Sequence, residues 1–140
     1  AGGIFLATKD NFFQTSDGLW LYYEVTGEGR PIVLIPGFGE ALTMWKYAVP
    51  VLSQRFQVVC LDPRGHGRSM KAAGNNRQKR MAQDIRELID HPGLEDVLLV
   101  GHSLGGAIVA TKLFLRLFLT SVVSVTASTL LAAVGLYKIF

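Results

Sequence analysis

The sequence predicts an α/β protein whose sheet is mostly parallel, with an antiparallel hairpin at its N-terminal end and helices on both faces. Short continuous apolar runs at 31–35, 56–61 and 97–100 are typical of strands buried on both faces of a sheet. Segments in which apolar residues recur at helical spacing separate these runs. Strands that alternate with helices are joined by right-handed crossovers, and this connection makes neighbouring strands parallel.

The hairpin and two helices are predicted from local patterns. Apolar and polar residues alternate on both sides of Asp17-Gly18, a strong turn signal, so 19–25 is expected to be the second strand of the hairpin. Helical spacing of apolar residues predicts helices over 41–52 and 81–89. The 140 residues, 49% hydrophobic and 18% charged, suit one globular domain spanning 1–140.

Charge and cysteine content exclude some classes of partner and site. The formal net charge of +3 is too small to indicate a nucleic-acid partner, and the basic stretch 77–80 is expected to be a solvated loop and helix start. Cys60 is the single cysteine and lies in an apolar run, so it is expected to be buried. The spacing of His and Cys gives no indication of a metal site, and no cofactor is expected.

The most informative residues follow the three apolar runs. In an open parallel sheet, functional residues gather at the carboxyl ends of the strands. Here each run is followed by a glycine-rich or charged turn, at 36–39, 62–69 and 101–106. The third turn reads Gly101-His102-Ser103-Leu104-Gly105, a G-x-S-x-G motif between a predicted strand and a predicted helix that begins near Leu104. This context makes Ser103 a candidate nucleophile, held at positive φ in a tight turn.

Backbone N–H groups near Ser103 are candidate donors to a developing oxyanion. The helix that begins near Leu104 directs its free N–H groups toward the reacting oxygen. In this architecture one donor follows the nucleophile, here Leu104, and the other comes from the loop after an earlier strand, here Phe38. Gly37 and Gly39 on either side of Phe38 allow that loop to approach closely.

None of the three histidines is expected to act as the general base. His66 lies on the same local turn as Asp62, and the two are expected to fix that turn through hydrogen bonds. His102 precedes Ser103, so its side chain is expected to point away from the position of a base. His91, beside Pro92-Gly93, is expected to end a helix at the surface.

Taken together, these motifs strongly resemble the α/β-hydrolase superfamily, in its N-terminal half. The resemblance runs from about 19 to 110 and includes 32–39, Trp45, 62–69, Asp84-Ile85 and 97–106. It is closest in style to small esterase, lactonase and cofactor-free peroxidase members. It implies a serine hydrolase, and a serine at this turn argues against the dehalogenase and epoxide-hydrolase branches, which the family builds with aspartate there.

The family's chain order places the acid and the histidine after the nucleophile. After residue 110 this chain has no Asp, Glu or His, and its charges there are Lys112, Arg116 and Lys138. The sequence is therefore expected to be a C-terminally truncated domain whose acid and histidine lie beyond residue 140. A serine without a base is a weak nucleophile, so this chain is expected to be inactive or nearly so.

The C-terminal residues permit two interpretations. In the first, 104–117 is a helix and 122–127, rich in good strand formers, is the next parallel strand. In the second, 117–136 is an uncharged transmembrane helix. Serine and threonine make that stretch only moderately apolar, which favours the first interpretation and a cytoplasmic rather than membrane-associated protein.

The expected function is hydrolysis of a small-molecule carboxylic ester or lactone by Ser103, with the oxyanion held by the N–H groups of Phe38 and Leu104. The alternative is a catalytically inactive binding or membrane-associated protein that retains half of the hydrolase fold. In either case, an open edge of the sheet is expected to favour self-association.

Overall fold

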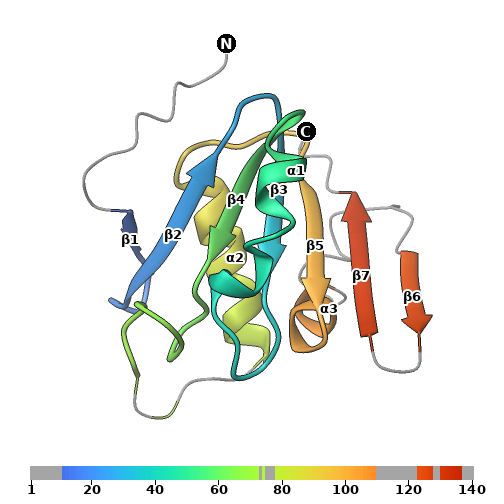
Figure 1. Cartoon of the computed structure of the whole chain (residues 1–140). Helices are drawn as coiled ribbons and strands as arrows, with labels where there is room; N and C mark the ends of the chain where they lie inside the picture. The colour runs from blue at the N-terminus through green and yellow to red at the C-terminus, as the bar shows by residue number, and fades with distance from the viewer. Residues whose placement is uncertain (1–10, 73, 75–77, 110–122, 128–129, 137–140) are drawn as a thin grey trace.

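In the computed structural model, residues 11–72, 74, 78–109, 123–127 and 130–136 are described. Within them, one sheet has the strand order β1-β2-β4-β3-β5-β7-β6 (Figure 1). The strands are β1 (Phe12–Gln14), β2 (Trp20–Thr26), β3 (Arg30–Ile35), β4 (Phe56–Leu61), β5 (Leu98–His102), β6 (Val123–Ala127) and β7 (Leu130–Leu136). The helices are the short 3₁₀ helix η1 (Leu42–Trp45) and the α-helices α1 (Val49–Leu52), α2 (Gln78–Asp90) and α3 (Leu104–Val109).

The predicted parallel strands form the centre of the sheet. Strand β3 is parallel to both β4 and β5, and Val33 pairs with Val59 on one side and Leu99 on the other. The predicted hairpin is also confirmed, because β1 and β2 are antiparallel and the chain turns at Asp17-Gly18 between them. Strand β2 then joins the centre antiparallel to β4. The α/β fold class predicted from the sequence is therefore observed.

The prediction that 122–127 is the next parallel strand is wrong. The described strand β6 pairs with β7 in antiparallel orientation, and β7 occupies the position beside β5, also antiparallel. Only two residues separate β6 from β7. A parallel pair needs a crossover of a dozen or more residues, so a connection this short forces an antiparallel pair.

The transmembrane interpretation of 117–136 also fails in the described part of that range, which consists of β6 and β7. Val and Thr residues in this segment favour strands. In the part of the chain that the structure describes, no helix has the length and apolar character needed to cross a membrane.

One of the predicted helices differs from expectation. The helix predicted over 41–52 is instead two short helices, η1 and α1, and Pro50 lies in the first turn of α1. Proline lacks an N–H group and its ring clashes with the preceding turn, so a continuous helix cannot pass through Pro50. The helix predicted over 104–117 begins as expected, as α3, but residues after Val109 lie outside the described part. The helix predicted over 81–89 is confirmed as α2.

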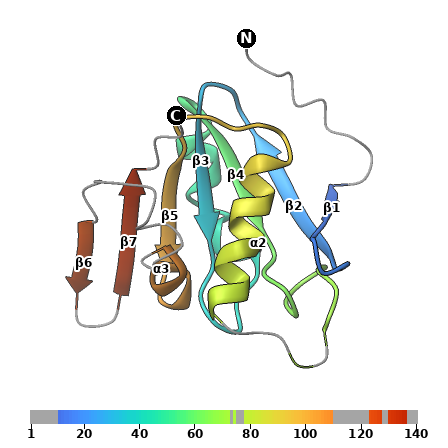
Figure 2. The ribbon, with the colours of Figure 1, turned by 180° about the vertical axis from the view of Figure 1, so that it is seen from behind.

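The alternating side chains of the central strands fill two cores, one on each face of the sheet. Val33, Ile35 and Val59 pack with buried residues of α2 and α3 on one face. Ile32, Leu34 and Cys60 pack with residues of η1 and α1 on the other. Figure 1 shows α1 in front of the sheet, and Figure 2 shows α2 across its back. Helices therefore cover both faces, and the turns at the carboxyl ends of β3, β4 and β5 meet at one end of the sheet.

Candidate active site

Ser103 alone connects strand β5 to helix α3. Its φ is 53°, as the sequence predicted, and its side chain is exposed. A Cβ atom on Gly101 would overlap the backbone of Gly105 and Gly106. A Cβ atom on Gly105 would likewise overlap the carbonyl oxygens of Ile35, the last residue of β3, and Pro36. The two glycines are therefore required by the close approach of the backbone, and this approach holds Ser103 in the strained region.

The loop after β3, residues 37–39 (the β3 loop), lies beside this turn. The N–H of Gly37 donates to Glu40 Oε2 at 3.0 Å, and the N–H of Gly39 donates to His66 Nε2 at 3.0 Å. Among the described residues, no acceptor lies in hydrogen-bonding geometry to the N–H of Phe38 between them. The N–H of Leu104, the first residue of α3, has no partner within the helix. Within the described residues, the N–H of Phe38 is therefore unpaired and the N–H of Leu104 is unpaired within its helix.

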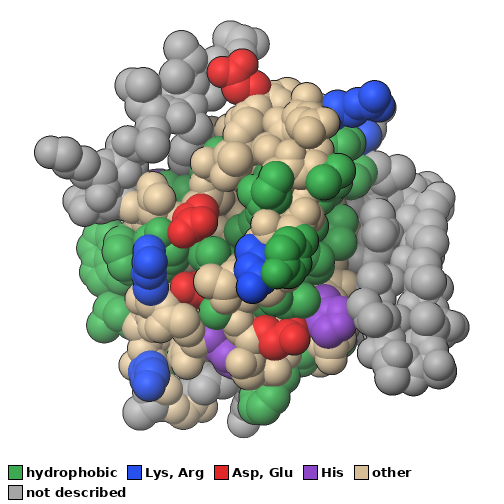
Figure 3. Space-filling model, viewed as in Figure 1, with side chains coloured by type: hydrophobic (Ala, Val, Ile, Leu, Met, Phe, Trp, Pro, Cys, Tyr) green, Lys and Arg blue, Asp and Glu red, His purple; other side chains and the backbone are tan. Residues whose placement is uncertain are grey.

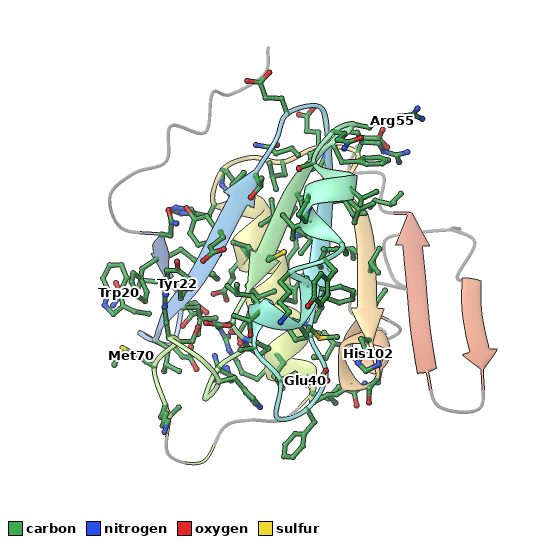
Figure 4. All side chains as sticks on the ribbon, viewed as in Figure 1. Trp20, Tyr22, Glu40, Arg55, Met70 and His102 are labelled. Carbon is green, nitrogen blue, oxygen red and sulfur yellow. The ribbon has the colours of Figure 1, made fainter. Side chains whose placement is uncertain are left out.

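Glu40 joins the β3 loop to the end of β5. Its Oε2 atom also lies 3.1 Å from Nδ1 of His102, the residue directly before Ser103. A Cβ atom on Gly37 would come within 2.6 Å of the Glu40 carboxylate and 3.2 Å of His102 Nδ1, so a larger residue there would displace the Glu40 side chain. Figure 4 shows the Glu40 and His102 side chains together at this end of the sheet. Figure 3 shows histidine and acidic side chains side by side on the surface there.

The turn after β4 is fixed by a buried carboxylate. Asp62 accepts hydrogen bonds from the N–H groups of Leu42 at 2.7 Å and Arg68 at 2.9 Å. Ser69 Oγ donates to the carbonyl oxygen of Asp62 at 2.6 Å and accepts from the N–H of Tyr22 at 2.8 Å. These bonds tie the turn to η1 and β2 and leave Asp62 unpaired with His66.

Both ring nitrogens of His66 bind backbone groups. Nδ1 lies 2.9 Å from the carbonyl oxygen of Arg64, and Nε2 lies 3.0 Å from the N–H of Gly39. Because a carbonyl oxygen only accepts and an N–H only donates, the proton lies on Nδ1 and the lone pair on Nε2. His66 thus holds the turn, as expected from the sequence, and also reaches the β3 loop, which was not expected. His91, directly after α2, is exposed.

A buried arginine supports the turn after β4 from the other face, and the sequence interpretation missed it. Arg64, 1% exposed, donates to both oxygens of Asp84 at 2.6 and 2.7 Å and to both oxygens of Asp17 at 3.0 and 3.1 Å. The hydrogen bonds from Arg64 hold the pKa of Asp17 well below its usual value, whereas burial raises the pKa of Asp84. These residues are far apart in sequence, so spacing gives no signal.

A separate cavity of about 220 Å³ opens between η1–α1 and strands β2 and β4. It is lined by Glu24, Thr26, Leu42, Thr43, Lys46, Val49, Pro50 and Cys60. Burial raises the pKa of the Cys60 thiol to about 12, so this thiol is protonated at neutral pH. Strand β4 is two positions from β5 in the sheet, and none of the lining residues comes from the β3 loop or the Ser103 turn. The cavity is therefore distinct from the candidate active site.

Comparison with known proteins identifies the family. The family model described as alpha/beta hydrolase fold matches residues 30–127. These residues include the β3 loop, the turn after β4 and the Ser103 turn. The chain belongs to the alpha/beta hydrolase family, as the sequence motifs predicted.

Individual relatives cover a range of hydrolase-fold enzymes. A soluble epoxide hydrolase from Corynebacterium sp. (strain C12) is 35% identical over 92 residues, covering 66% of this chain and 32% of that protein. A non-heme haloperoxidase from Rhodococcus erythropolis is 38% identical over 100 residues, covering 71% of this chain and 36% of that protein. The chain thus spans about a third of the length of these curated relatives.

The fold also matches solved structures. An esterase, EaEST, from Exiguobacterium antarcticum superposes with a TM-score of 0.71 at 32% sequence identity. The match covers 76% of this chain and 40% of that protein. The chain therefore has part of the hydrolase fold, in agreement with the partial fold predicted from the sequence.

Proposed function

We propose that this chain carries the nucleophile and the oxyanion-binding groups of a serine hydrolase that acts on small carboxylic esters or lactones. The observation that carries the proposal is the exposed Ser103 at a φ of 53°, between two glycines where an added Cβ would overlap backbone atoms. Among the described residues, the N–H of Phe38 has no acceptor and the N–H of Leu104 has none within its helix, and both belong to turns beside this serine. This combination suits attack on a carbonyl carbon.

In the proposed reaction, Ser103 Oγ forms a bond to the carbonyl carbon of the substrate. The π electrons of the carbonyl move to its oxygen, and the N–H groups of Phe38 and Leu104 donate hydrogen bonds to the resulting oxyanion. The carbon–oxygen bond to the leaving group then breaks, the leaving oxygen takes up a proton, and water hydrolyses the acyl-serine. Preorganised N–H donors stabilise charge that develops only in the transition state.

The proton of Ser103 needs an acceptor, and this requirement sets the expected rate. A positioned base contributes about a hundred- to ten-thousand-fold to such a step. No Asp, Glu or His follows Ser103 within the 140 residues. His66 precedes it and uses both ring nitrogens on backbone groups. We therefore propose that the chain of 140 residues forms an acyl-serine slowly and turns over very slowly or not at all.

The nature of the nucleophile favours an ester or lactone over other substrates of the family. The family resemblance implies that epoxide-hydrolase and dehalogenase branches use aspartate at this turn, and this chain has serine. The likeness to an esterase structure with a TM-score of 0.71 supports the same choice. The oxyanion formed from a carbonyl substrate also makes use of two N–H donors.

The test is acylation of the purified chain by an activated ester, followed by mass spectrometry of its peptides. We expect an acyl adduct on Ser103 that is absent in Ser103→Ala and present in both His66→Ala and the exposed control His91→Ala. An adduct elsewhere, or ester turnover that Ser103→Ala leaves unchanged, would overturn the assignment. A folded chain that forms no adduct would support the alternative of an inactive binding protein.

A further inference from the structure

The β3 loop is held by a side chain on each side of Phe38. On one side, the Gly37 N–H donates to Glu40 Oε2 at 3.0 Å. On the other, the Gly39 N–H donates to His66 Nε2 at 3.0 Å. Glu40 lies next to the loop in sequence, but His66 comes from the turn after β4, 27 residues away. The Gly39–His66 bond is therefore a link between the turns that follow two neighbouring strands.

Apart from His66, few contacts of the described residues restrain Phe38 and Gly39. Gly39 has a φ of 75°, and a Cβ atom placed on it would meet nothing within 4 Å. The Phe38 side chain is 80% exposed, and its ring contacts the His66 ring edge-on, with centroids 5.9 Å apart. His66 is thus in contact with both residues of the exposed half of the loop. A glycine in open space is free to rotate, so a hydrogen bond to its N–H has a large effect on loop geometry.

The His66 ring is itself fixed. Its Nδ1–H donates to the carbonyl oxygen of Arg64 at 2.9 Å, which orients the ring and leaves the Nε2 lone pair directed at Gly39. Arg64 is anchored in turn by its two carboxylate partners, Asp84 and Asp17. The acceptor for Gly39 is therefore supported by a turn whose Arg64 side chain is buried and bonded to two carboxylates.

We propose that His66 is a positioning residue, which holds the β3 loop so that the N–H of Phe38 remains directed toward the oxyanion formed at Ser103. This inference rests on the proposed function. His66 contacts neither Ser103 nor the substrate in this role and acts only through the loop. In this role, His66 must supply a hydrogen-bond acceptor at the position of Nε2.

Two substitutions at position 66 test the roles of the two ring nitrogens separately. Glutamine at position 66 places an amide oxygen near the position of Nε2, so His66→Gln keeps an acceptor for Gly39. Asparagine has a shorter side chain that reaches only the position of Nδ1, so His66→Asn keeps the Arg64 contact and loses the Gly39 contact. A role in stability alone would not distinguish these variants by reactivity at Ser103. His91→Gln is the matched control, since His91 lies outside the site.

The readout is phosphonylation of Ser103 by a fluorophosphonate, in which serine oxygen bonds to phosphorus, fluoride leaves and the serine proton passes to solvent. The phosphoryl oxygen takes the place of the oxyanion. We expect His66→Asn to lower the limiting rate of labelling about 10- to 100-fold without a change in the half-saturating concentration, because misplacing a donor affects the transition state. His66→Gln is expected to stay within about threefold of wild type, as is His91→Gln.

Equal losses in His66→Gln and His66→Asn, or no loss in either, would overturn the positioning role and leave the proposed function intact. Failure of the wild-type chain to label at Ser103 would overturn the proposed function itself, and this inference with it. Nitrogen-15 NMR of the wild-type imidazole gives a test that needs no variant to fold. In the neutral imidazole we expect the proton on Nδ1 and not on Nε2, and a neutral imidazole with its proton on Nε2 would refute the proposal.

Discussion

Replacing Gly101 with alanine tests the packing that creates the serine turn. The added Cβ would overlap the carbonyl carbon and oxygen of Gly105 and the nitrogen of Gly106. All three atoms belong to backbone, so no side chain can rotate away to make room. Gly101 is not among the glycines with positive φ, and the whole cost of Gly101→Ala therefore comes from this overlap.

The expected loss of folding stability in Gly101→Ala lies at the upper end of the range for overpacked sites. Adding a methyl group to a well-packed site costs about 1–3 kcal/mol, and the rigid contacts here point to about 3 kcal/mol. In a chain of this size each kcal/mol lowers the melting temperature by roughly 3–4 °C. We therefore expect the melting temperature of Gly101→Ala to fall by about 10 °C.

Thermal unfolding followed by circular dichroism measures this change. Gly93→Ala is the matched control, because Gly93 has a φ of 67° but nothing within 4 Å of its Cβ position. Its expected cost is about 1–2 kcal/mol, from backbone strain alone. A melting temperature for Gly101→Ala that equals wild type, or a loss no larger than that of Gly93→Ala, would refute the close approach of β5 and α3.

Three further predictions concern stability and assembly. Arg64→Ala is expected to cost about 3–5 kcal/mol in urea unfolding, because it leaves the buried Asp84 carboxylate without its main partner, whereas Arg30→Ala breaks an exposed pair with Asp96 and should cost under about 1 kcal/mol. The folded pKa of Asp17 lies below its unfolded value of about 3.9, so its contribution is present above that pH and is lost as the pH falls further. Asp17→Asn should therefore show a shallower acid loss of stability, and an unchanged acid profile would contradict this. Among the described residues, strand β6 lies at an edge of the sheet and has no charged residue, so light scattering is expected to detect oligomers, and a monodisperse monomer would contradict the prediction.

Local patterns were sufficient to predict much of this fold, and the failures have physical causes. The alternation of apolar and polar residues around Asp17-Gly18 and the apolar run at 56–61 are patterns within single strands. They can therefore be recognised without knowledge of the neighbouring strands. The helix expected over 41–52 is interrupted at Pro50, although the apolar residues of this segment have helical spacing. The error at 122–127 arose because no strand was predicted at 130–136, and the pairing of a strand depends on the neighbour that follows it.

The candidate site was predictable only where its chemistry is local. Ser103 and its two glycines lie within five residues, so one motif contains the whole turn. Glu40 and Arg64 escaped notice because their roles depend on partners that folding brings together, 62 residues away for Glu40 and His102. The same is true of the bond from Gly39 to His66, which converts a local turn residue into a contact of the β3 loop.

The most direct test of the central claim is a crystal structure of the chain after phosphonylation. We predict phosphorus bonded to Ser103 Oγ, with one phosphoryl oxygen about 2.7–3.1 Å from the backbone nitrogens of both Phe38 and Leu104. A label on any other residue would contradict the assignment of the nucleophile. A phosphoryl oxygen that turns to solvent, away from both nitrogens, would contradict the oxyanion site.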